Sequence, residues 1–455
     1  MTDAQELKAE LEKKEVDELA PYALRSRERR EALGDRFREH PDPTPLEYRT
    51  EYHRDRDRIL WSSAFRRLQH KTQIFPHYVE DHYRRRLTHT LEVSQIAGTL
   101  CRALRLNETA GEAISLGHDI GHAPFGHGGE ATLNRKLIDW HSSTRAGHAD
   151  SPVDVIALSS TPVLLYGFDH CVQGVEQVSR ISVDYRPDFG LNLSFDVRDG
   201  IIKHIYDRKP SEAEAEGRPF SSLANIVRLE RFKPFGRNCG SLEAQCVWFA
   251  DKVGYLLGDM EDALRAGIFT CREVRASALV RQIWTQHGRR RKTSGKLKIE
   301  SRHEFLAFKR GALAVLILDC VEASKRRIQD AGVSCVDDVL SREDRLVDVG
   351  EDLRKAWDKF FDKFQKGQLY VDDQIRTCEF KARTIVEGLF EAYVQDEHLI
   401  PAEFRDRTSQ AYDGMLQDSE VNLMAARNYV AGMTDSYATE QHKRLYMSSE
   451  RAGVL

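Results

Sequence analysis

The sequence predicts an all-α protein, with a helical core, appended C-terminal helices and a few short strands. Apolar residues recur at helical spacing through most of the chain, and this periodicity is the main indicator of amphipathic helices. The composition, 41% hydrophobic and 31% charged, is typical of a globular protein rich in helix. Residues 189–195 (FGLNLSF) alternate apolar with small or polar residues and are the best strand candidate.

The 455 residues divide into three expected segments. Residues 1–45 form a charged N-terminal extension, in which the prolines of HPDPTP (40–45) end a first helix. Residues 46–275 form the helical core, and residues 276–455 form a C-terminal helical region that packs on that core. A chain of this length can fold as one large domain or as two ordinary ones.

The core has three clear helical stretches. Residues 52–134 have the strongest helical pattern. Apolar residues near helical spacing in that stretch are Leu87, Leu91, Ile96, Leu100 and Leu104. A second helix opens at residues 111–116 and ends in the glycine-rich run 121–129. Residues 241–266 predict a third, long helix.

Two core segments predict loops. Residues 141–165 are irregular and rich in Ser, Gly, Ala and Pro, which indicates an insertion or a surface loop. Residues 207–240 carry charge, Gly and Pro and are also expected to be loop-like. From about residue 277 onward, helical stretches alternate with charged connections.

The bulk properties place few limits on function. The net charge of -4 neither indicates nor excludes an anionic partner, because local clusters decide binding. Eight cysteines are scattered singly without a CxxC pair, which is typical of reduced, structural thiols. No apolar run reaches the roughly 18 residues of a membrane span. The polar N-terminus lacks the apolar region of a signal peptide, so we expect no membrane association and a cytoplasmic location.

The dipeptide His118-Asp119 is the first feature of chemical interest. Adjacent residues on a regular helix point about 100° apart and do not normally share one small ligand. A metal can accept both side chains if the helix ends there, and Gly117 and Gly121 flank the pair. An imidazole nitrogen and a carboxylate oxygen suit Mn, Fe, Co, Ni or Zn.

Two further residues complete a possible metal site. His89 lies one helix earlier and can be a ligand or an ordinary core histidine. Asp251 can be a solvated helix residue, but it follows the apolar run 247–250, which favours an interior face. Together these residues resemble the H…HD…D order of the HD superfamily of metal-dependent phosphohydrolases. This resemblance implies that His89, His118, Asp119 and Asp251 bind a metal.

Several blocks resemble a narrower family, the deoxyguanosinetriphosphate triphosphohydrolases. These blocks are residues 54–73, 86–93, 118–130 (HDIGHAPFGHGGE), 167–173, 190–193, 250–262 (ADKVGYLLGDMED) and 431–435 (AGMTD). The resemblance implies an HD phosphohydrolase core that cleaves a dNTP to deoxynucleoside and tripolyphosphate. It also implies a divalent cation (Mn, Mg, Co, Fe or Ni), a homo-oligomer such as a hexamer or tetramer, and a nucleotide effector. Between about residues 275 and 420 the resemblance is weak.

The resemblance also implies contacts to the substrate's phosphates. Cations are unusually dense before His89, at Arg66, Arg67, Lys71, Arg84, Arg85 and Arg86. A solvated charged face is the alternative for most of them, and Arg86 is the expected phosphate ligand. Lys252 follows Asp251 in an ADK sequence where bacterial members commonly have ADD, and it is expected to reach the terminal phosphates. His170 is either a ligand of the α-phosphate or a structural residue.

Three ionisable residues crowd the glycine-rich turn after the metal pair. They are His122, His127 and Glu130. The resemblance implies that His127 and Glu130 form a catalytic pair, in which the carboxylate orients an imidazole that transfers a proton. We hypothesise that a metal-activated water attacks the α-phosphorus, and that His127 either protonates the 5′-oxygen or activates the water.

Three positions match family residues near the deoxyribose. Asp259 and Gln73 can bond a 3′-hydroxyl, and Tyr255 can exclude a 2′-hydroxyl, although core packing is an equal alternative for this tyrosine. Asp251, Tyr255 and Asp259 are four residues apart and therefore share one helix face.

Other features leave alternatives open. The basic run 287–298 can bind single-stranded nucleic acid or an effector nucleotide, but a solvated surface loop is favoured. For function, dGTP is the first candidate substrate. The alternatives are another HD-type nucleotidase or phosphodiesterase, or a catalytically silent protein that senses nucleotides or nucleic acid.

Overall fold

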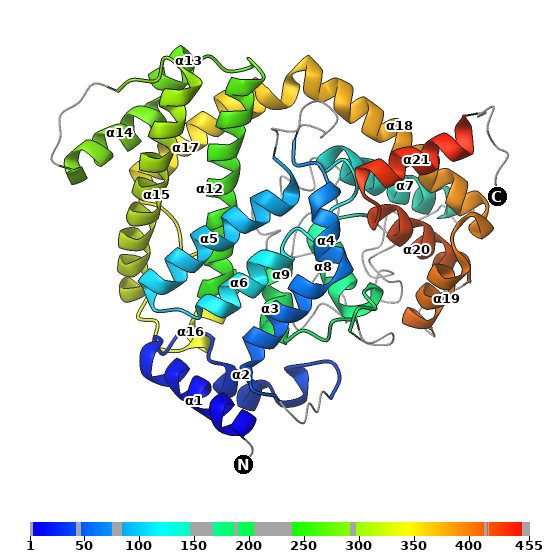
Figure 1. Cartoon of the computed structure of the whole chain (residues 1–455), viewed down its shortest axis with the longest axis horizontal. Helices are drawn as coiled ribbons and strands as arrows, with labels where there is room; N and C mark the ends of the chain where they lie inside the picture. Colours follow the sequence, from blue (N-terminus) through cyan, green and yellow to red (C-terminus); the bar gives the residue numbers. More distant parts are fainter. Residues whose placement is uncertain are drawn as a thin grey trace.

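The computed structural model describes residues 3–41, 47–74, 84–145, 167–185, 190–203, 239–291, 297–413, 416 and 418–447. These residues fold as the predicted all-α protein (Figure 1). The predicted loops at 141–165 and 207–240 lie largely outside the described residues. The exceptions are residues 141–145, which continue a helix, and residues 239–240, which precede one.

The N-terminal half supplies twelve of the described helical elements. In chain order they are α1 (Asp3–Glu18), α2 (Ser26–Leu33), η1 (Gly34–Arg36), α3 (Glu51–Trp61), α4 (Ser63–Arg67), η2 (Leu68–His70), α5 (Arg86–Leu104), α6 (Glu108–Gly117), α7 (His127–Arg145), α8 (His170–Glu176), η6 (Gln177–Ile181) and α9 (Phe195–Ile202).

The remaining described elements begin with the long helix α12. They are α12 (Leu242–Arg265), α13 (Cys271–Ala276), α14 (Ala278–Arg291), α15 (Arg302–Asp330), α16 (Val336–Leu340), α17 (Glu351–Phe360), η9 (Phe361–Lys366), η10 (Leu369–Val371), α18 (Asp373–Gln395), η11 (Glu397–Leu399), α19 (Ala402–Ala411), α20 (Asp418–Ala431) and α21 (Asp435–Tyr446).

Helix α12 is the central element of the core. The Ser241 side chain caps it by accepting a hydrogen bond from Ala244 N at 3.2 Å, which satisfies one of the unpaired amides of the first turn. Its residues are buried on nearly every side, because α5, α6, α9 and α15 all pack against it. The helix predicted at residues 241–266 is therefore confirmed almost to the residue.

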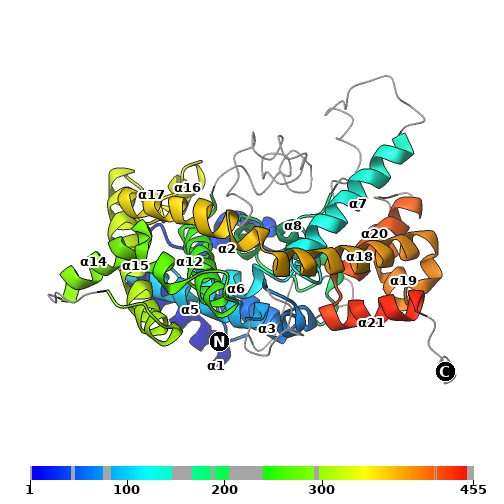
Figure 2. The same cartoon turned by 90° about the horizontal axis from the view of Figure 1, so that it is seen from above.

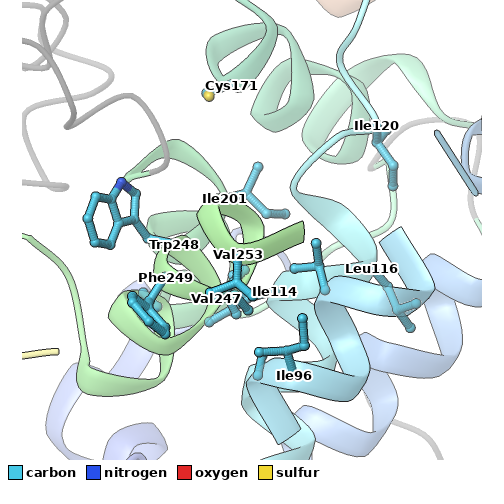
Figure 3. Close-up of a cluster of buried hydrophobic side chains, with 14 of the residues drawn as sticks. Ile96, Ile114, Leu116, Ile120, Cys171, Ile201, Val247, Trp248, Phe249 and Val253 are labelled. Carbon is cyan, nitrogen blue, oxygen red and sulfur yellow. The ribbon is translucent and has the colours of Figure 1, made fainter. Parts of the chain in front are cut away.

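Helices α5, α6 and α9 build the apolar core with α12. Figure 3 shows Ile96 of α5, Ile114 of α6 and Ile201 of α9 gathered around Val247 and Val253 of α12. All five side chains are at most 3% exposed, and burial of apolar area is the main stabilising contribution to folding. This packing fixes the positions of α5, α6 and α12 relative to one another, and these helices also carry buried polar residues.

The strand predicted at residues 189–195 is wrong for the part that the structure describes. Gly190 and Asn192 have φ values of +57° and +47°, which break an extended backbone. Leu191 and Leu193 are instead buried in an irregular segment, and α9 begins at Phe195. Within the described residues the extended pairing is confined to isolated bridges such as the antiparallel one between Thr72 and Arg85.

The N-terminal extension is joined to the core by ion pairs. The Glu51 carboxylate of α3 lies 2.9 Å from Lys8 Nζ and within 2.8 Å of the guanidinium groups of Arg30 and Arg38. Because this carboxylate is buried, loss of these cations would leave an uncompensated charge in the interior. The predicted segment boundaries at residues 45 and 275 remain predictions.

The C-terminal helices close the other side of the molecule. Helix α18 runs above the core in Figure 1 and packs against α7, α20 and α21. Figure 2 shows α7 rising from the body beside α18 and α20.

All eight cysteines are described and are free thiols, as expected. Among the described helices none is long and apolar enough to cross a membrane.

Candidate metal centre and active site

Helix α6 ends immediately before the His-Asp pair, as the flanking glycines predict. Its last residue is Gly117, where an added Cβ would lie 2.6 Å from the Ile201 side chain. At Gly121 an added Cβ would lie 2.0 Å from the backbone oxygen of His170, so only glycine permits this approach of α8. The end of the helix allows the adjacent His118 and Asp119 side chains to turn toward one point.

Four buried side chains from α5, the end of α6 and α12 converge. His89 Nε2 lies 2.8 Å from Asp251 Oδ1, and His118 Nε2 lies 3.8 Å from the same oxygen. His118 Nε2 also lies 3.5 Å from Asp119 Oδ1. Each of the four side chains is at most 1% exposed. The structure thus brings together the four residues that the sequence pattern nominated as metal ligands.

Neighbouring groups orient the two imidazoles. His118 Nδ1 lies 2.6 Å from the Ser115 backbone oxygen, which leaves Nε2 facing the two carboxylates. Gly254, one turn after Asp251 on α12, leaves room for the His89 ring, since an added Cβ would be 3.1 Å from its Cε1 atom. Two oriented imidazole nitrogens and two carboxylates are a donor set that fits a divalent transition metal.

The electrostatic environment keeps Asp119 ionised. Burial opposes its charge, but the positive charges of His118, His122 and Arg86 outweigh burial and hold its pKa well below the usual value. For His89, burial favours the neutral ring, whereas the hydrogen bond and charge of Asp251 more than compensate and raise its pKa. An ionised carboxylate is the form that binds a metal.

Arg86 is the first residue of α5 and is fully buried. Its Nη1 atom donates to Asp119 Oδ2 at 3.0 Å. Within the described part of the chain, its Nε and Nη2 atoms have no hydrogen-bond partner. A buried guanidinium with unused N–H groups beside a candidate metal ligand can receive an anion.

A second polar cluster, which we call the histidine cluster, adjoins the candidate metal ligands. It consists of His122, His127, Glu130 and His170. His170 Nδ1 lies 2.9 Å from Glu130 Oε1, and His127 Nδ1 lies 3.5 Å from Glu130 Oε2. The rings of His122 and His170 stack at 3.8 Å between centroids. Glu130 therefore lies between two imidazoles, whereas the sequence paired it with His127 alone.

The members of the histidine cluster differ in exposure and charge. The His127 side chain is 62% exposed, while His170 is mostly buried. Burial disfavours the charge of His170, but Cys171 and Glu130 outweigh it and raise the pKa of this histidine well above the usual value. Burial and the positive charge of Arg86 lower the pKa of His122 well below the usual value. The pKa values of these two buried rings are therefore shifted in opposite directions, downward for His122 and upward for His170.

Two of the residues assigned to the sugar, Tyr255 and Asp259, occupy the next turns of α12. The Tyr255 ring lies 4.9 Å from the His89 ring, between centroids. Asp259 Oδ2 accepts hydrogen bonds from Gln365 Nε2 at 2.5 Å and from Tyr370 Oη at 3.2 Å. Sequence analysis missed these two partners, because η9 and η10 lie more than 100 residues further along the chain.

Two assigned residues have less defined surroundings. Gln73 is 5% exposed, and its amide atoms have no hydrogen-bond partner among the residues described. Lys252 follows Asp251 on α12 and is half-buried.

The predicted cation cluster does not gather at one place. Lys71 is buried and donates to the backbone oxygens of His122 and Ala431, while Arg66 is 65% exposed and lies 3.8 Å from Asp184. The surface-loop interpretation of the basic run 287–298 is wrong for residues 287–291, which end α14. Residues 292–296 of that run lie outside the described residues.

Comparison with known protein families gives two matches. Residues 86–152 match the HD domain, and residues 351–444 match the phosphohydrolase-associated domain. The first match includes His89, His118 and Asp119, and the second includes Asp435 at the start of α21.

Similar curated proteins extend over nearly the whole chain. A protein of Bordetella pertussis is 34% identical over 95% of this chain and 97% of its own length. A protein of Ralstonia pickettii is 33% identical over 94% of each chain, and one of Brucella ovis is 34% identical over 88% of this chain and 90% of its own. All three are named deoxyguanosinetriphosphate triphosphohydrolase-like protein.

Proposed function

The chain belongs to the family of deoxyguanosinetriphosphate triphosphohydrolase-like proteins and contains its phosphohydrolase HD domain, and from this premise we propose that it hydrolyses dNTPs. The proposed products are a deoxynucleoside and tripolyphosphate, and dGTP is the first substrate to test. The proposed reaction is attack of water on the α-phosphorus, with the bond to the 5′-oxygen breaking.

The arrangement of Arg86 beside Asp119 supports this proposal most directly. A guanidinium that is buried and only partly hydrogen-bonded is unfavourable unless an anion completes its contacts. A phosphate oxygen can accept from Nε and Nη2 while Nη1 stays on Asp119, so one phosphate would be held next to the metal-binding residues. We propose that this is the α-phosphate.

His89, His118, Asp119 and Asp251 are the proposed ligands of a divalent cation (Mn, Mg, Co, Fe or Ni). Bound there, the cation would polarise a phosphoryl oxygen and lower the pKa of a water molecule. The protein's own contribution is to hold two carboxylates and two imidazole rings at one point and to exclude bulk water from it.

The histidine cluster is the proposed site of proton transfer. Glu130 accepts from His170 and lies beside His127, so it can orient both rings. His127, exposed to solvent, can exchange protons with water and is the proposed acid or base. We propose that His122 takes part in catalysis with this pair, and that His170, whose pKa is raised by its neighbours, contacts the α-phosphate.

The remaining assigned residues would select the rest of the substrate. Lys252 is proposed to reach the terminal phosphates. Asp259 and Gln73 are proposed to bond the 3′-hydroxyl, and Tyr255 is proposed to block a 2′-hydroxyl. The position of Tyr255 against the ring of His89 supports its placement next to the reacting phosphate.

One assay tests the proposal. The purified protein is incubated with Mn or Mg and each of the four dNTPs, singly and mixed, and the products are identified. Tripolyphosphate and deoxynucleoside are the expected products. Release of pyrophosphate or monophosphate would favour another HD-type nucleotidase or phosphodiesterase. Tight dNTP binding by the metal-loaded protein without turnover would favour a sensing protein.

The incubation with mixed dNTPs also tests for a nucleotide effector.

We propose that the protein forms a homo-oligomer, a hexamer or tetramer, in the cytoplasm. Light scattering coupled to size exclusion would determine its size. A single-stranded oligonucleotide added to the assay would test whether nucleic acid changes the rate.

A further inference from the structure

A carboxylate at the start of the last described helix contacts the turn that links the metal-binding pair to His127. Asp435 is the first residue of α21 and is 1% exposed. Its Oδ1 atom accepts a hydrogen bond from the backbone nitrogen of Phe125 at 2.8 Å, across 310 residues of chain. Phe125 lies two residues before His127, at the point where α7 begins.

The same carboxylate also holds the segment that carries Gln73. Asp435 Oδ2 accepts from the backbone nitrogen of Thr72 at 2.9 Å and from the Thr72 hydroxyl. Beside it, Lys71 Nζ donates to the backbone oxygen of His122 and to that of Ala431 at 2.9 Å. We call these contacts of Ala431 and Asp435 the C-terminal clamp.

The turn that the clamp holds has an unfavourable backbone. Phe125 and Gly126 have φ values of +62° and +61°, in the left-handed region. Gly126 adopts it freely, but an aromatic residue with a Cβ atom does so only when surrounding contacts impose it. An added Cβ on Gly126 would lie 3.1 Å from Arg86 Nη2 and 3.3 Å from the Gln73 backbone oxygen. The turn is thus packed directly against two proposed substrate ligands.

We propose that Asp435 is a positioning residue of the active site, which sets the places of His127 and Gln73 through the backbones of Phe125 and Thr72. This inference rests on the proposed function. The carboxylate offers two acceptor oxygens to three donors. An amide offers one acceptor oxygen, and its NH₂ group would face an N–H donor in either orientation. A charge-neutral isostere therefore cannot replace Asp435.

The first test is the kinetic effect of Asp435→Asn. We expect kcat for the dNTP that the parent cleaves to fall about 10- to 100-fold, since small misplacements of reacting groups have effects of this size. KM is expected to stay within about threefold, because the substrate's phosphates still meet Arg86. Asp373→Asn is the matched control, as Asp373 is the first residue of α18 but is exposed. An Asp435→Asn enzyme with kcat within twofold of the parent would overturn the proposal.

The second test does not require activity. Hydrogen–deuterium exchange of residues 71–74 and 118–130 should rise in Asp435→Asn, while exchange in α15 should stay as in the parent. Faster exchange in α15 as well would indicate general destabilisation and contradict a positioning role. If Asp435→Asn does not fold, Thr72→Val removes one of the three donors at similar size and should give the same local pattern, with kcat lowered about threefold.

The two proposals fail separately. A parent enzyme that cleaves none of the dNTPs would remove the proposed function, yet the exchange experiment would still show whether Asp435 holds the turn. An active parent with unchanged exchange in Asp435→Asn would remove the clamp alone.

Discussion

Two groups of buried carboxylates in this protein have similar burial, but their pKa values are shifted in opposite directions. At the candidate metal centre, Asp119 is surrounded by His118, His122 and Arg86, and its interactions with them keep its pKa well below the usual value despite burial. Two turns beyond Asp251, burial dominates at Asp259 and raises its pKa to about 7, although hydrogen bonds from Gln365 and Tyr370 act against this. The neighbours therefore decide whether burial leaves a carboxylate charged.

This difference suggests a division of labour along α12. The charged group suits cation binding, whereas a carboxylate that is half protonated near pH 7 can both accept and donate hydrogen bonds to a neutral hydroxyl. Substitutions at these carboxylates and at the side chains that contact them test this division, from the largest expected effect to the smallest.

Asp251→Asn should have the largest effect. The substitution removes a ligand charge while keeping the side-chain shape, so we expect loss of bound metal and a fall in kcat/KM of at least about 10³-fold. Metal content by mass spectrometry and steady-state kinetics measure the two effects. Asp262→Asn is the matched control on the same helix, and it should retain metal. A fully metal-loaded Asp251→Asn protein would show that this residue is no ligand.

Arg86→Lys keeps the positive charge beside Asp119 but loses the planar set of donors. We expect kcat/KM for the dNTP to fall about 10- to 100-fold, because a lysine cannot bridge Asp119 and a phosphate in the same way. Metal content should change little. The neighbouring Arg85→Lys variant is the control and should behave as the parent. An Arg86→Lys enzyme with the kcat/KM of the parent would mean that the charge of this side chain, and not its planar set of donors, matters here.

Gln365→Leu perturbs the Asp259 group. It removes the donor that lowers the pKa of Asp259, so the pKa should rise above about 7 and the side chain should be mostly protonated at neutral pH. We expect KM for the dNTP to rise about 3- to 10-fold with kcat nearly unchanged, as one oriented hydrogen bond is lost. A Gln365→Glu variant, which adds a negative charge next to Asp259, should raise KM further. An unchanged KM in both variants would show that Asp259 takes no part in substrate binding.

Glu243→Gln extends the comparison to the first turn of α12 and should affect stability alone. Burial raises the pKa of Glu243 to about 7, although the backbone nitrogens of Leu24 and Asn107 donate to it. The folded protein therefore binds a proton that the unfolded chain releases above its ordinary pKa of 4.5. The parent's free energy of unfolding should fall as pH rises from about 4.5 to about 7, by at most about 3 kcal/mol.

Chemical denaturation at several pH values measures this dependence. The Glu243→Gln protein lacks the titrating group, so its stability relative to the parent should increase over the same pH interval. A difference that stays constant across the interval would contradict the raised pKa.

The sequence predicted the parts of the site that depend on local order. The periodicity of residues 241–266 and the glycines around His118-Asp119 were enough to place a long helix and a helix end, and both were confirmed. The convergence of His89 and Asp251 on that point follows from apolar packing of α5, α6 and α12, which the periodic apolar residues also encode.

Contacts between distant segments could not be predicted. The pairing of Glu130 with His170, across 40 residues, depends on how α8 packs against Gly121. The hydrogen bonds from η9 and η10 to Asp259 likewise depend on tertiary packing that no spacing rule describes. The alternation in residues 189–195 suggested a strand, and Leu191 and Leu193 are indeed buried. The left-handed backbone of Gly190 and Asn192, which breaks the extended conformation, could not be predicted from the alternation.

The long sequence separation within the C-terminal clamp also affects how the protein is made. All four proposed metal ligands have been synthesised by residue 251, whereas Asp435 follows 184 residues later. At about 5–20 residues per second, a growing chain spends on the order of 10–40 seconds between these two points. The turn ahead of His127 is therefore held in place only after the last described helix has been made, long after the four proposed ligands.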